Sequence, residues 1–511
     1  PRHRFLGWPM DEDDVRAAVD HGHETLAKDG WLVLASDGLT DFVDDPAGAI
    51  RDAAMFAILA GHAADPDLQD ALRPTAVRLV DDLIDAACDG GAGDNVAVVA
   101  LRGTVESWDG GWRVSDSDEA EARRQGSAAG DDKDLRQASA AEDAGRLRST
   151  HAVDLDPADR FRGCLLGGAI GDALGAGIEH DSLRRIRRRF GPDGLVDPAP
   201  AYGRDSAITD DTQMTLFTAE ALLRTFTRAA ERGVPGDAVW QLDQAYARWL
   251  RTQGERSLRW PNPGDRSTVE RLLAGPDARR GPGRTCIAAM RGSVAGTPDE
   301  PTNSSKGCGG VMRVAPVGLM VEDLDDAMGL AHRAAALTHG HPTGRYAAGA
   351  FAGLIALLRG GAPLSIAVAV VAEELGYAEG ADETCEALIR ARGLLGEAIA
   401  PSAELVQSRG EGWVADEALA IGVSCALLAR DFEHGVLLAV NHGGDSDSTG
   451  AIAGALLGMM FGAEAIPERW LDGLEHANEI ADIADDLHAA ASEDGDPDVL
   501  GERWQARWPA E

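Results

Sequence analysis

The sequence predicts a multidomain protein in which a partial α/β segment precedes an all-helical domain. Short apolar runs bounded by glycine and aspartate indicate alternating strands and helices in residues 1–103. From residue 154 onward, amphipathic segments rich in alanine and leucine follow one another with almost no strand-like run. Residues 104–153 are rich in acidic and small residues and poor in large apolar ones, so we expect a disordered linker there.

The individual elements follow from the hydrophobic periodicity. In the first segment, we expect strands at Trp31–Ala35 and at 96–101, with helices at 47–59 and 75–87 between them. The helical domain is expected to cover residues 154–490, followed by a C-terminal tail at 491–511. Its predicted helices are residues 164–176, 212–231, 237–252, 323–337, 343–359, 364–376, 381–398, 415–430 and 449–461.

The composition excludes several classes of function. Among the 511 residues, 48 are Lys or Arg and 85 are Asp or Glu, which leaves a net charge of −37. Because a protein that tracks phosphates needs clustered positive charge, nucleic acid is not expected as a partner. No apolar run approaches the ~18 residues of a membrane-spanning helix. The six cysteines lack paired C-x-x-C spacing, so we expect reduced thiols in a soluble cytoplasmic protein.

Two oxygen-rich clusters, far apart in the sequence, indicate a metal site. Residues 209–212 (T-D-D-T) begin an apolar-periodic segment, and residues 445–449 (D-S-D-S-T) begin a helix of small residues. Carboxylate and hydroxyl oxygens are ligands that suit Mg²⁺ or Mn²⁺. Helix N-capping explains one aspartate per helix, but it does not explain two with neighbouring hydroxyls. We therefore expect the fold to bring both clusters into one site.

Two segments of the N-terminal part resemble the metal-dependent Ser/Thr protein phosphatase family. The A-S-D-G-L run around Asp37 matches one family segment, and D-N-V-A-V, beginning at Asp94, matches another except that Ala97 replaces Thr or Ser. The resemblance implies that Asp37 and Asp94 are metal ligands. The glycine-flanked aspartates that complete the family's two-metal site do not precede Asp37, so we expect a partial or degenerate phosphatase-like segment.

The remainder resembles the ADP-ribosylglycohydrolase family, because five family motifs occur in the family's order between residues 155 and 470. They are G-D-A-x-G-x-x-x-E at 171–179, I-T-D-D-T at 208–212, K-G-C-G-G-V-M-R-V-A-P at 306–316, L-T-H-G-H-P at 337–342 and N-H-G-G-D-S-D-S-T-G-A-I-A-G at 441–454. The resemblance implies an all-α fold that holds two Mg²⁺ or Mn²⁺ ions. It also implies hydrolytic removal of ADP-ribose from a modified protein side chain or a small ADP-ribose conjugate.

The same resemblance implies roles for individual residues. The metal ligands would be Thr209, Asp210, Asp211, Asp445, Asp447 and Ser448, the last where the family usually has threonine. The substrate-binding residues would be Gly307, Cys308, Gly309, Gly310, Met312, His339, Gly444 and Ser446. Many relatives have asparagine at the position of Cys308. Either Glu179 or Asp211 would act as the general acid or base.

Several of these features have structural alternatives. The basic run at 184–189 is interpreted as the solvated face of a helix, and the glycines of 167–175 as a close helix contact. His341 and His442 are equally compatible with hydrogen bonding in loops. Three tryptophans can stack on a base, although core packing is the preferred interpretation: Trp249, Trp260 and Trp413. Two other functions remain open, a non-catalytic ADP-ribose-binding module and a protein phosphatase whose N-terminal half is missing.

Overall fold

The N-terminal part contains one described pair of strands. The structure is a computed structural model, and it describes residues 31–35, 98–102, 155–232, 236–264, 267–396, 400–492 and 497–510. Strands β1 (Trp31–Ala35) and β2 (Val98–Arg102) pair antiparallel, with Trp31 opposite Arg102. Strand β1 coincides with a predicted strand and β2 overlaps the other. The predicted helices at 47–59 and 75–87, the linker, Asp37 and Asp94 lie outside the described residues.

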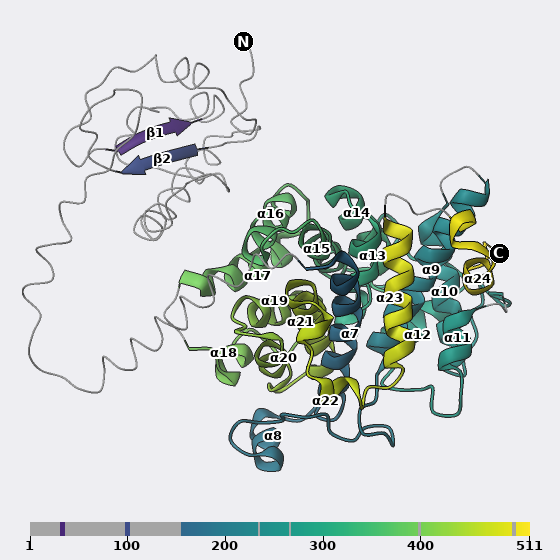
Figure 1. Ribbon diagram of the computed structural model, residues 1–511, viewed down its shortest axis with the longest axis horizontal. Coiled ribbons are helices and arrows are strands. Elements are labelled where there is room, and N and C mark those ends of the chain that lie inside the picture. Colours follow the sequence, from purple (N-terminus) through teal and green to yellow (C-terminus); the bar gives the residue numbers. More distant parts are fainter. Residues whose placement is uncertain are drawn as a thin grey trace, which may run out of the picture. The chain divides into compact units, whose positions relative to one another are not determined.

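The second part of the chain is helical in the residues that the structure describes (Figure 1). Its longer helices are α7 (Pro157–Ala176), α8 (Leu183–Phe190), α9 (Asp210–Arg232), α10 (Ala238–Thr252), α12 (Arg284–Arg291), α14 (Leu324–Ala336), α15 (Pro342–Arg359), α16 (Leu364–Gly376), α17 (Asp382–Gly393), α19 (Ala415–Leu427), α20 (Phe432–Val440), α21 (Ser446–Phe461), α23 (Ala477–Ala491) and α24 (Pro497–Arg507). The shorter ones are α11 (Thr268–Leu273), α13 (Ala315–Met320), α18 (Ala403–Gln407), α22 (Glu468–Leu471), η1 (Cys308–Gly310), η2 (Leu394–Gly396) and η3 (Ala463–Ala465). None of these described helices is long and apolar enough to span a membrane.

Helices α7 and α21 pack antiparallel with their backbones in contact. An added Cβ at Gly163 would lie 2.3 Å from Gly458 O, and one at Gly171 would lie 1.9 Å from Gly450 O. At Gly175, the same atom would lie 2.3 Å from Asp447 N. Only glycine permits this separation, so the interpretation of the α7 glycines as a close helix contact is confirmed. The contact brings the C-terminal end of α7 beside the first turn of α21.

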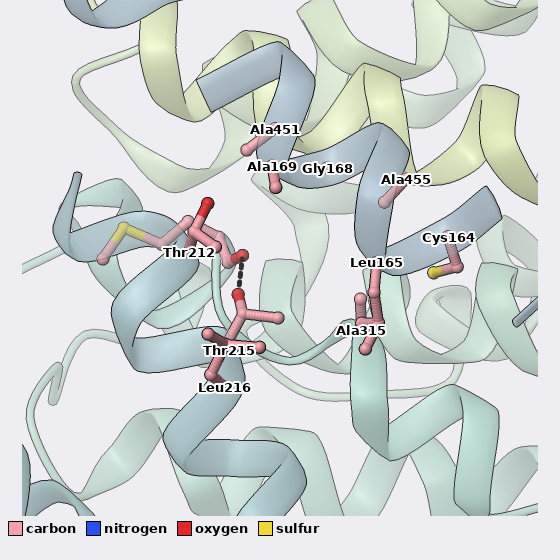
Figure 2. A pocket seen from close by; sticks show the side chains of 11 residues that line it. Cys164, Leu165, Gly168, Ala169, Thr212, Thr215, Leu216, Ala315, Ala451 and Ala455 are labelled. Atoms are coloured by element: carbon pink, nitrogen blue, oxygen red, sulfur yellow. Dashed lines mark hydrogen bonds between the residues drawn. The ribbon is translucent and has the colours of Figure 1, made fainter. Parts of the chain in front are cut away.

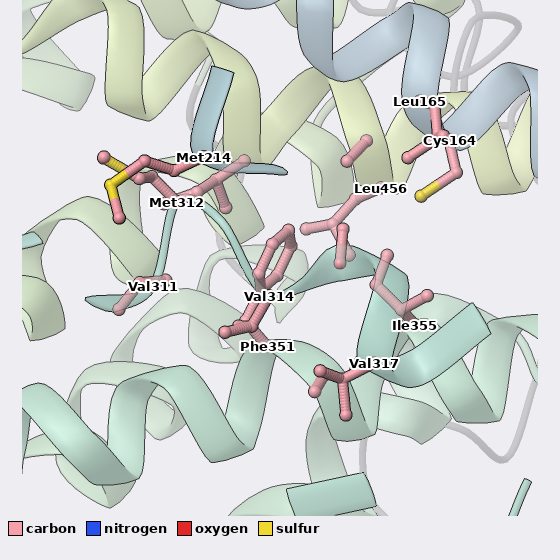
Figure 3. Packing of buried hydrophobic residues seen from close by; sticks show 14 of the residues in the cluster. Cys164, Leu165, Met214, Val311, Met312, Val314, Val317, Phe351, Ile355 and Leu456 are labelled. Carbon is pink, nitrogen blue, oxygen red and sulfur yellow. The ribbon is translucent and has the colours of Figure 1, made fainter. Parts of the chain in front are cut away.

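A shared apolar core holds α7 and α21 against the neighbouring helices. Figure 3 shows side chains from five helices that meet in this core: Leu165 of α7, Met214 of α9, Val317 of α13, Phe351 of α15 and Leu456 of α21. Each of them is at most 3% exposed. Because these helices share one core, the ends of α7, α9 and α21 are fixed relative to one another.

Two segments bear on further predictions. The basic run forms α8, in which Arg185 and Arg189 pair with Asp181, so these arginines have structural partners.

Helix α24 lies in the segment expected to be a tail, where Trp504 is 4% exposed and Trp508 is fully buried. The indole N–H of Trp508 donates to Asp486 Oδ2 at 2.8 Å. The packed domain therefore includes residues beyond 490.

Candidate metal centre

The ends of three helices bring acidic side chains together. Glu179 follows α7, Asp210 and Asp211 begin α9, and Asp445 is the N-cap of α21. Glu179, Asp445 and Asp447 each offer a carboxylate oxygen, and these three oxygens lie within 4.8 Å of one another. The charges of Asp445 and Asp447 act on Asp211, so the two clusters separated in the sequence share one site.

A further carboxylate, Asp172 of α7, organises the turn that begins α9. Asp172 is fully buried, and its Oδ2 accepts the N–H of Thr209 at 2.9 Å and that of Thr212 at 3.1 Å. It also accepts the hydroxyl of Thr212. In the sequence, Asp172 is part of the G-D-A-x-G-x-x-x-E motif at 171–179, but no role was predicted for it. The available signal was a single carboxylate in the otherwise small and apolar run 164–176, where a charge is buried only when it is hydrogen-bonded.

The two aspartates of α9 differ in their hydrogen bonding. Asp210 Oδ2 accepts the N–H of Gly283 at 3.2 Å. Asp211 is 3% exposed, and its Oδ1 has no hydrogen-bond partner in the part of the chain that the structure describes, while its Oδ2 lies 3.5 Å from Thr209 Oγ1. Buried carboxylate oxygens are nearly always paired, so an unpaired oxygen at this position is suited to a cation.

A neighbouring loop fixes the start of α21. Asp445 N–H donates to Glu411 O at 2.8 Å, and Cys308 Sγ donates to Asp445 Oδ2 at 2.8 Å. Gly444 has φ +141°, and an added Cβ would lie 2.0 Å from Glu411 O, so only glycine fits here. Ser446 is fully buried, and its hydroxyl lies 3.5 Å from Gly444 O. Gly444 and Ser446 were predicted to bind substrate. Their contacts in the structure are with the protein itself and hold the loop before α21 in place.

The carboxylates of the cluster are buried beside one another. Burial raises the pKa of Asp210, Asp211 and Asp445 well above the usual value, and the neighbouring carboxylates raise it further. Burial and then Asp447 raise the pKa of Glu179 to about 9. Within the described residues, no Lys or Arg forms an ion pair with these four groups. Carboxylates buried together without counter-charge fit divalent cations, which prefer oxygen ligands.

The glycine-rich segment at 307–310 lies beside α21, next to the loop before α19. Gly307 forms a β-bridge with Val414, and Cys308 N–H donates to Trp413 O at 3.3 Å. Gly310 and Met312 are buried, whereas Gly307, Cys308 and Gly309 are partly exposed. The N–H groups of Gly307 and Cys308 thus donate within the protein, to Ser305 Oγ and to Trp413 O.

The ring of His339 packs against the glycine-rich segment at 307–310. An added Cβ at Gly309 would lie 2.9 Å from His339 Cε1, and His339 Nδ1 lies 2.8 Å from Thr338 Oγ1. Burial and the charge of Arg313 lower the pKa of His339 to about 3. The ring is therefore neutral at physiological pH, and its contacts are those of a packing residue.

The other histidines of the motifs are structural. His442 is fully buried, its Nε2 lies 2.8 Å from Thr449 Oγ1, and burial lowers its pKa to about 4. His341 is the N-cap of α15, where its Nδ1 accepts the N–H of Thr343 at 3.2 Å. Both residues match the hydrogen-bonding alternative.

Aromatic side chains lie at the rim of the site. His180 follows Glu179 with φ +67°, and its ring centroid lies 4.9 Å from that of Trp413. Trp413 is 37% exposed, whereas Trp249 is fully buried. Trp260 is partly buried and donates to Asp243 Oδ2 at 2.6 Å. Core packing was the wrong expectation for Trp413, because a tryptophan in a loop has no periodic pattern that reveals its exposure.

Two cavities differ in size and setting. Figure 2 shows the smaller, about 20 Å³, between α7, α9 and α21, with Thr212, Thr215 and Ala451 in its wall. It has room for about one water molecule. The larger, about 230 Å³, is lined by Arg390, Arg409 and residues of α19 that follow the Trp413 loop. Only the larger one has space for an organic group.

Comparison with known proteins assigns the helical part of the chain to a family. The profile described as ADP-ribosylglycohydrolase matches residues 154–497. The chain belongs to the ADP-ribosylglycohydrolase family. It is therefore a glycohydrolase. The match begins at residue 154, and the phosphatase resemblance of residues 1–103 has no support from the comparisons.

Three relatives illustrate the similarity. An uncharacterized protein of Archaeoglobus fulgidus is 28% identical over 345 residues, 65% of this chain and 96% of that protein. ADP-ribosylhydrolase ARH3 of Mus musculus is 26% identical over 367 residues, 65% of this chain and 92% of ARH3. ADP-ribosyl-[dinitrogen reductase] glycohydrolase of Rhodospirillum rubrum is 26% identical over 324 residues, 62% of this chain and 90% of that enzyme. Each alignment spans most of the relative, so the similarity covers a whole domain of this ADP-ribosylglycohydrolase.

Proposed function

We propose that the helical domain is a metal-dependent hydrolase that removes ADP-ribose from a modified protein side chain or from a small ADP-ribose conjugate. One observation carries the metal dependence: among the described residues, Asp210, Asp211 and Asp445 are buried together without a cationic partner, and Asp211 Oδ1 has no hydrogen bond. The names of the mouse and Rhodospirillum relatives, both hydrolases that act on ADP-ribosylated substrates, support the reaction.

The donor set fits two Mg²⁺ or Mn²⁺ ions. The residues that would hold them are Thr209, Asp210, Asp211, Asp445, Asp447 and Ser448, all at most 4% exposed. When bound, such ions supply positive charge for the ribose hydroxyls and lower the pKa of a coordinated water. Asp172 would keep the α9 turn in a binding conformation, because it fixes the N–H groups of Thr209 and Thr212.

The remaining groups of the site suit a glycoside substrate. The Glu179 side chain is 20% exposed, and the raised pKa of this carboxyl favours its protonated form near neutral pH in the metal-free protein, so it can donate a proton. The glycines at 307–310 let the backbone approach a diphosphate closely. Trp413, exposed at the rim, offers a ring face for a planar group such as adenine.

The test is release of ADP-ribose by the full chain from arginine-linked, serine-linked and O-acetyl substrates, with Mg²⁺ or with chelator. We expect release that requires the metal and is lost in Asp445→Ala, but not in Asp472→Ala, which alters an exposed aspartate in the loop after α22. Circular dichroism checks that both variants fold. If ADP-ribose binds but no substrate is cleaved, the chain is a binding module and the proposed hydrolysis is wrong.

A further inference from the structure

Two sulfur atoms lie against the α21 side of the carboxylate cluster. Cys308 Sγ is 2.8 Å from Asp445 Oδ2. Ser448 Oγ lies 3.7 Å from Cys308 Sγ and 3.9 Å from Met312 Sδ. Of the three proposed ligands of this side, Asp445 and Ser448 therefore both contact the same thiol.

The thiol also lies near Asp211. Burial and then the charges of Asp445 and Asp211 raise the pKa of the Cys308 thiol well above its usual value, and the buried Oδ1 of Asp211 has no hydrogen-bond partner among the described residues. Cys308 as a whole residue is partly exposed, whereas its thiol is buried beside the carboxylates. A cation held by Asp211 and Asp445 would thus have a sulfur atom among its nearest neighbours.

Sulfur changes which cation such a site prefers. Oxygen ligands suit Mg²⁺, whereas thiolate ligands favour softer ions such as Zn²⁺, and affinity for divalent ions also rises from Mn²⁺ to Co²⁺. Cys308 and Ser448 are in contact with each other, so the sulfur lies directly against a proposed ligand.

We propose that Cys308 Sγ is a soft donor in the metal site, which therefore binds Co²⁺ and Cd²⁺ in preference to Mg²⁺. The proposal rests on the proposed function, since it uses the same ligands. A bond from sulfur to the ion replaces the S–H bond, and the proton passes to the solvent. The hydroxyls of Thr209 and Ser448 and the carboxylates complete the donor set.

The test measures metal binding directly. Full-length metal-free protein is titrated with Mg²⁺, Co²⁺ and Cd²⁺ by calorimetry, and the near-ultraviolet absorption of the Co²⁺ form reports a sulfur-to-cobalt bond. The variant is Cys308→Ser, and the matched control is Cys385→Ser, which alters a partly exposed thiol of α17 that contacts Ala372 O. In Cys308→Ser, we expect the preference for Cd²⁺ over Mg²⁺ to fall about tenfold or more. The sulfur-to-cobalt absorption should disappear in that variant and persist in the control.

Other outcomes separate this inference from the proposed function. If the wild-type Co²⁺ form lacks the absorption, or the cation preference is the same in Cys308→Ser, the soft-donor proposal is wrong, while Mg²⁺-dependent release of ADP-ribose would leave the hydrolase proposal standing. If the wild-type protein binds none of the three cations, both proposals fail. Cys308→Asn provides a second variant if the serine variant does not fold, and it should shift preference toward Mg²⁺.

Discussion

At Glu179, burial and neighbouring aspartates act on a single carboxyl group. Its pKa is raised from 4.5 to about 9, so between these values the folded, metal-free protein binds more protons than the unfolded chain. The stability that this group contributes is present below pH 4.5 and is lost as the pH rises through 9. The carboxyl group therefore makes the metal-free protein less stable in alkaline solution.

We predict that Glu179→Gln removes this pH dependence. In chelator, the free energy of unfolding of the variant relative to wild type should increase from pH 5 to pH 9, because glutamine carries no charge. Urea unfolding at pH 5, 7 and 9 measures the difference. With saturating Mg²⁺ the difference should shrink, since the cation compensates the charge. A difference that is independent of pH would contradict the buried position of this carboxyl.

Asp172 is a positioning residue, because it contacts the turn that carries Asp210 and Asp211. Asp172→Asn replaces one accepting oxygen with an N–H₂ group, so we expect metal affinity to fall roughly 10- to 100-fold. Mn²⁺ titration provides the measurement. The control is Asp243→Asn, which alters a buried aspartate paired with Arg259 and should lower stability while metal affinity is unchanged. Unchanged affinity in Asp172→Asn would show that the turn holds without it.

Trp413 allows a prediction about substrate binding. If its exposed ring stacks on a planar group of the substrate, Trp413→Ala should raise KM by about tenfold or more with little change in kcat, because stacking contributes roughly 1–3 kcal/mol. Steady-state kinetics separates the two constants. Trp240→Ala is the control, since Trp240 of α10 is also 37% exposed. Equal effects of both variants would count against a specific role.

Among the helices, the contact between α7 and α21 does most to position the site. Gly171→Ala would place Cβ 1.9 Å from Gly450 O, so we expect a loss of about 1–3 kcal/mol or more in the free energy of unfolding. Gly168→Ala is the matched control on the same helix, because its Cβ would lie 3.5 Å from Ala451 O. This variant should be neutral or slightly stabilising, since alanine favours helix by roughly 1 kcal/mol. Thermal and urea unfolding distinguish the two.

Gly171→Ala also tests how the packing affects the site. Any separation of α7 from α21 moves Glu179 away from Asp447, so metal affinity should fall together with stability. A variant that unfolds earlier but binds Mn²⁺ as tightly as wild type would show that the loops, and not the helix contact, position the ligands.

For the whole molecule, the metal site couples ligand binding to stability. A cation that binds only the folded state at 100 times its Kd adds about 2.7 kcal/mol to the free energy of unfolding. We therefore expect the Tm of the full chain to rise by several degrees with Mn²⁺ and to fall with chelator, as measured by calorimetry. The shift should be absent in Asp445→Ala. A shift of equal size in that variant would mean that the cation binds elsewhere.

Many of the helices could be predicted from the sequence, because each depends on local periodicity. Predicted helices at 237–252, 343–359 and 364–376 agree with α10, α15 and α16 to within one residue at each end. Helix α24 was not predicted, because its side chains are buried by packing against α23 and against α9, which lies far away in the sequence. One such contact is that of Trp504 with Thr227 of α9. The short helix α13 begins at the end of a motif and has little periodicity of its own.

The sequence by itself determined the helical fold of the second part and the family, since these depend on residue type and local order. The oxygen donors Thr209, Asp210, Asp211, Asp445, Asp447 and Ser448 stay a prediction from the sequence. Only the tertiary structure decided that Asp172 holds the α9 turn, that Cys308 contacts Asp445, and that Trp413 is exposed. These contacts join residues far apart in the chain. Their distances follow from how α7, α9 and α21 pack, and helix packing depends on the shapes of whole faces rather than on any local pattern.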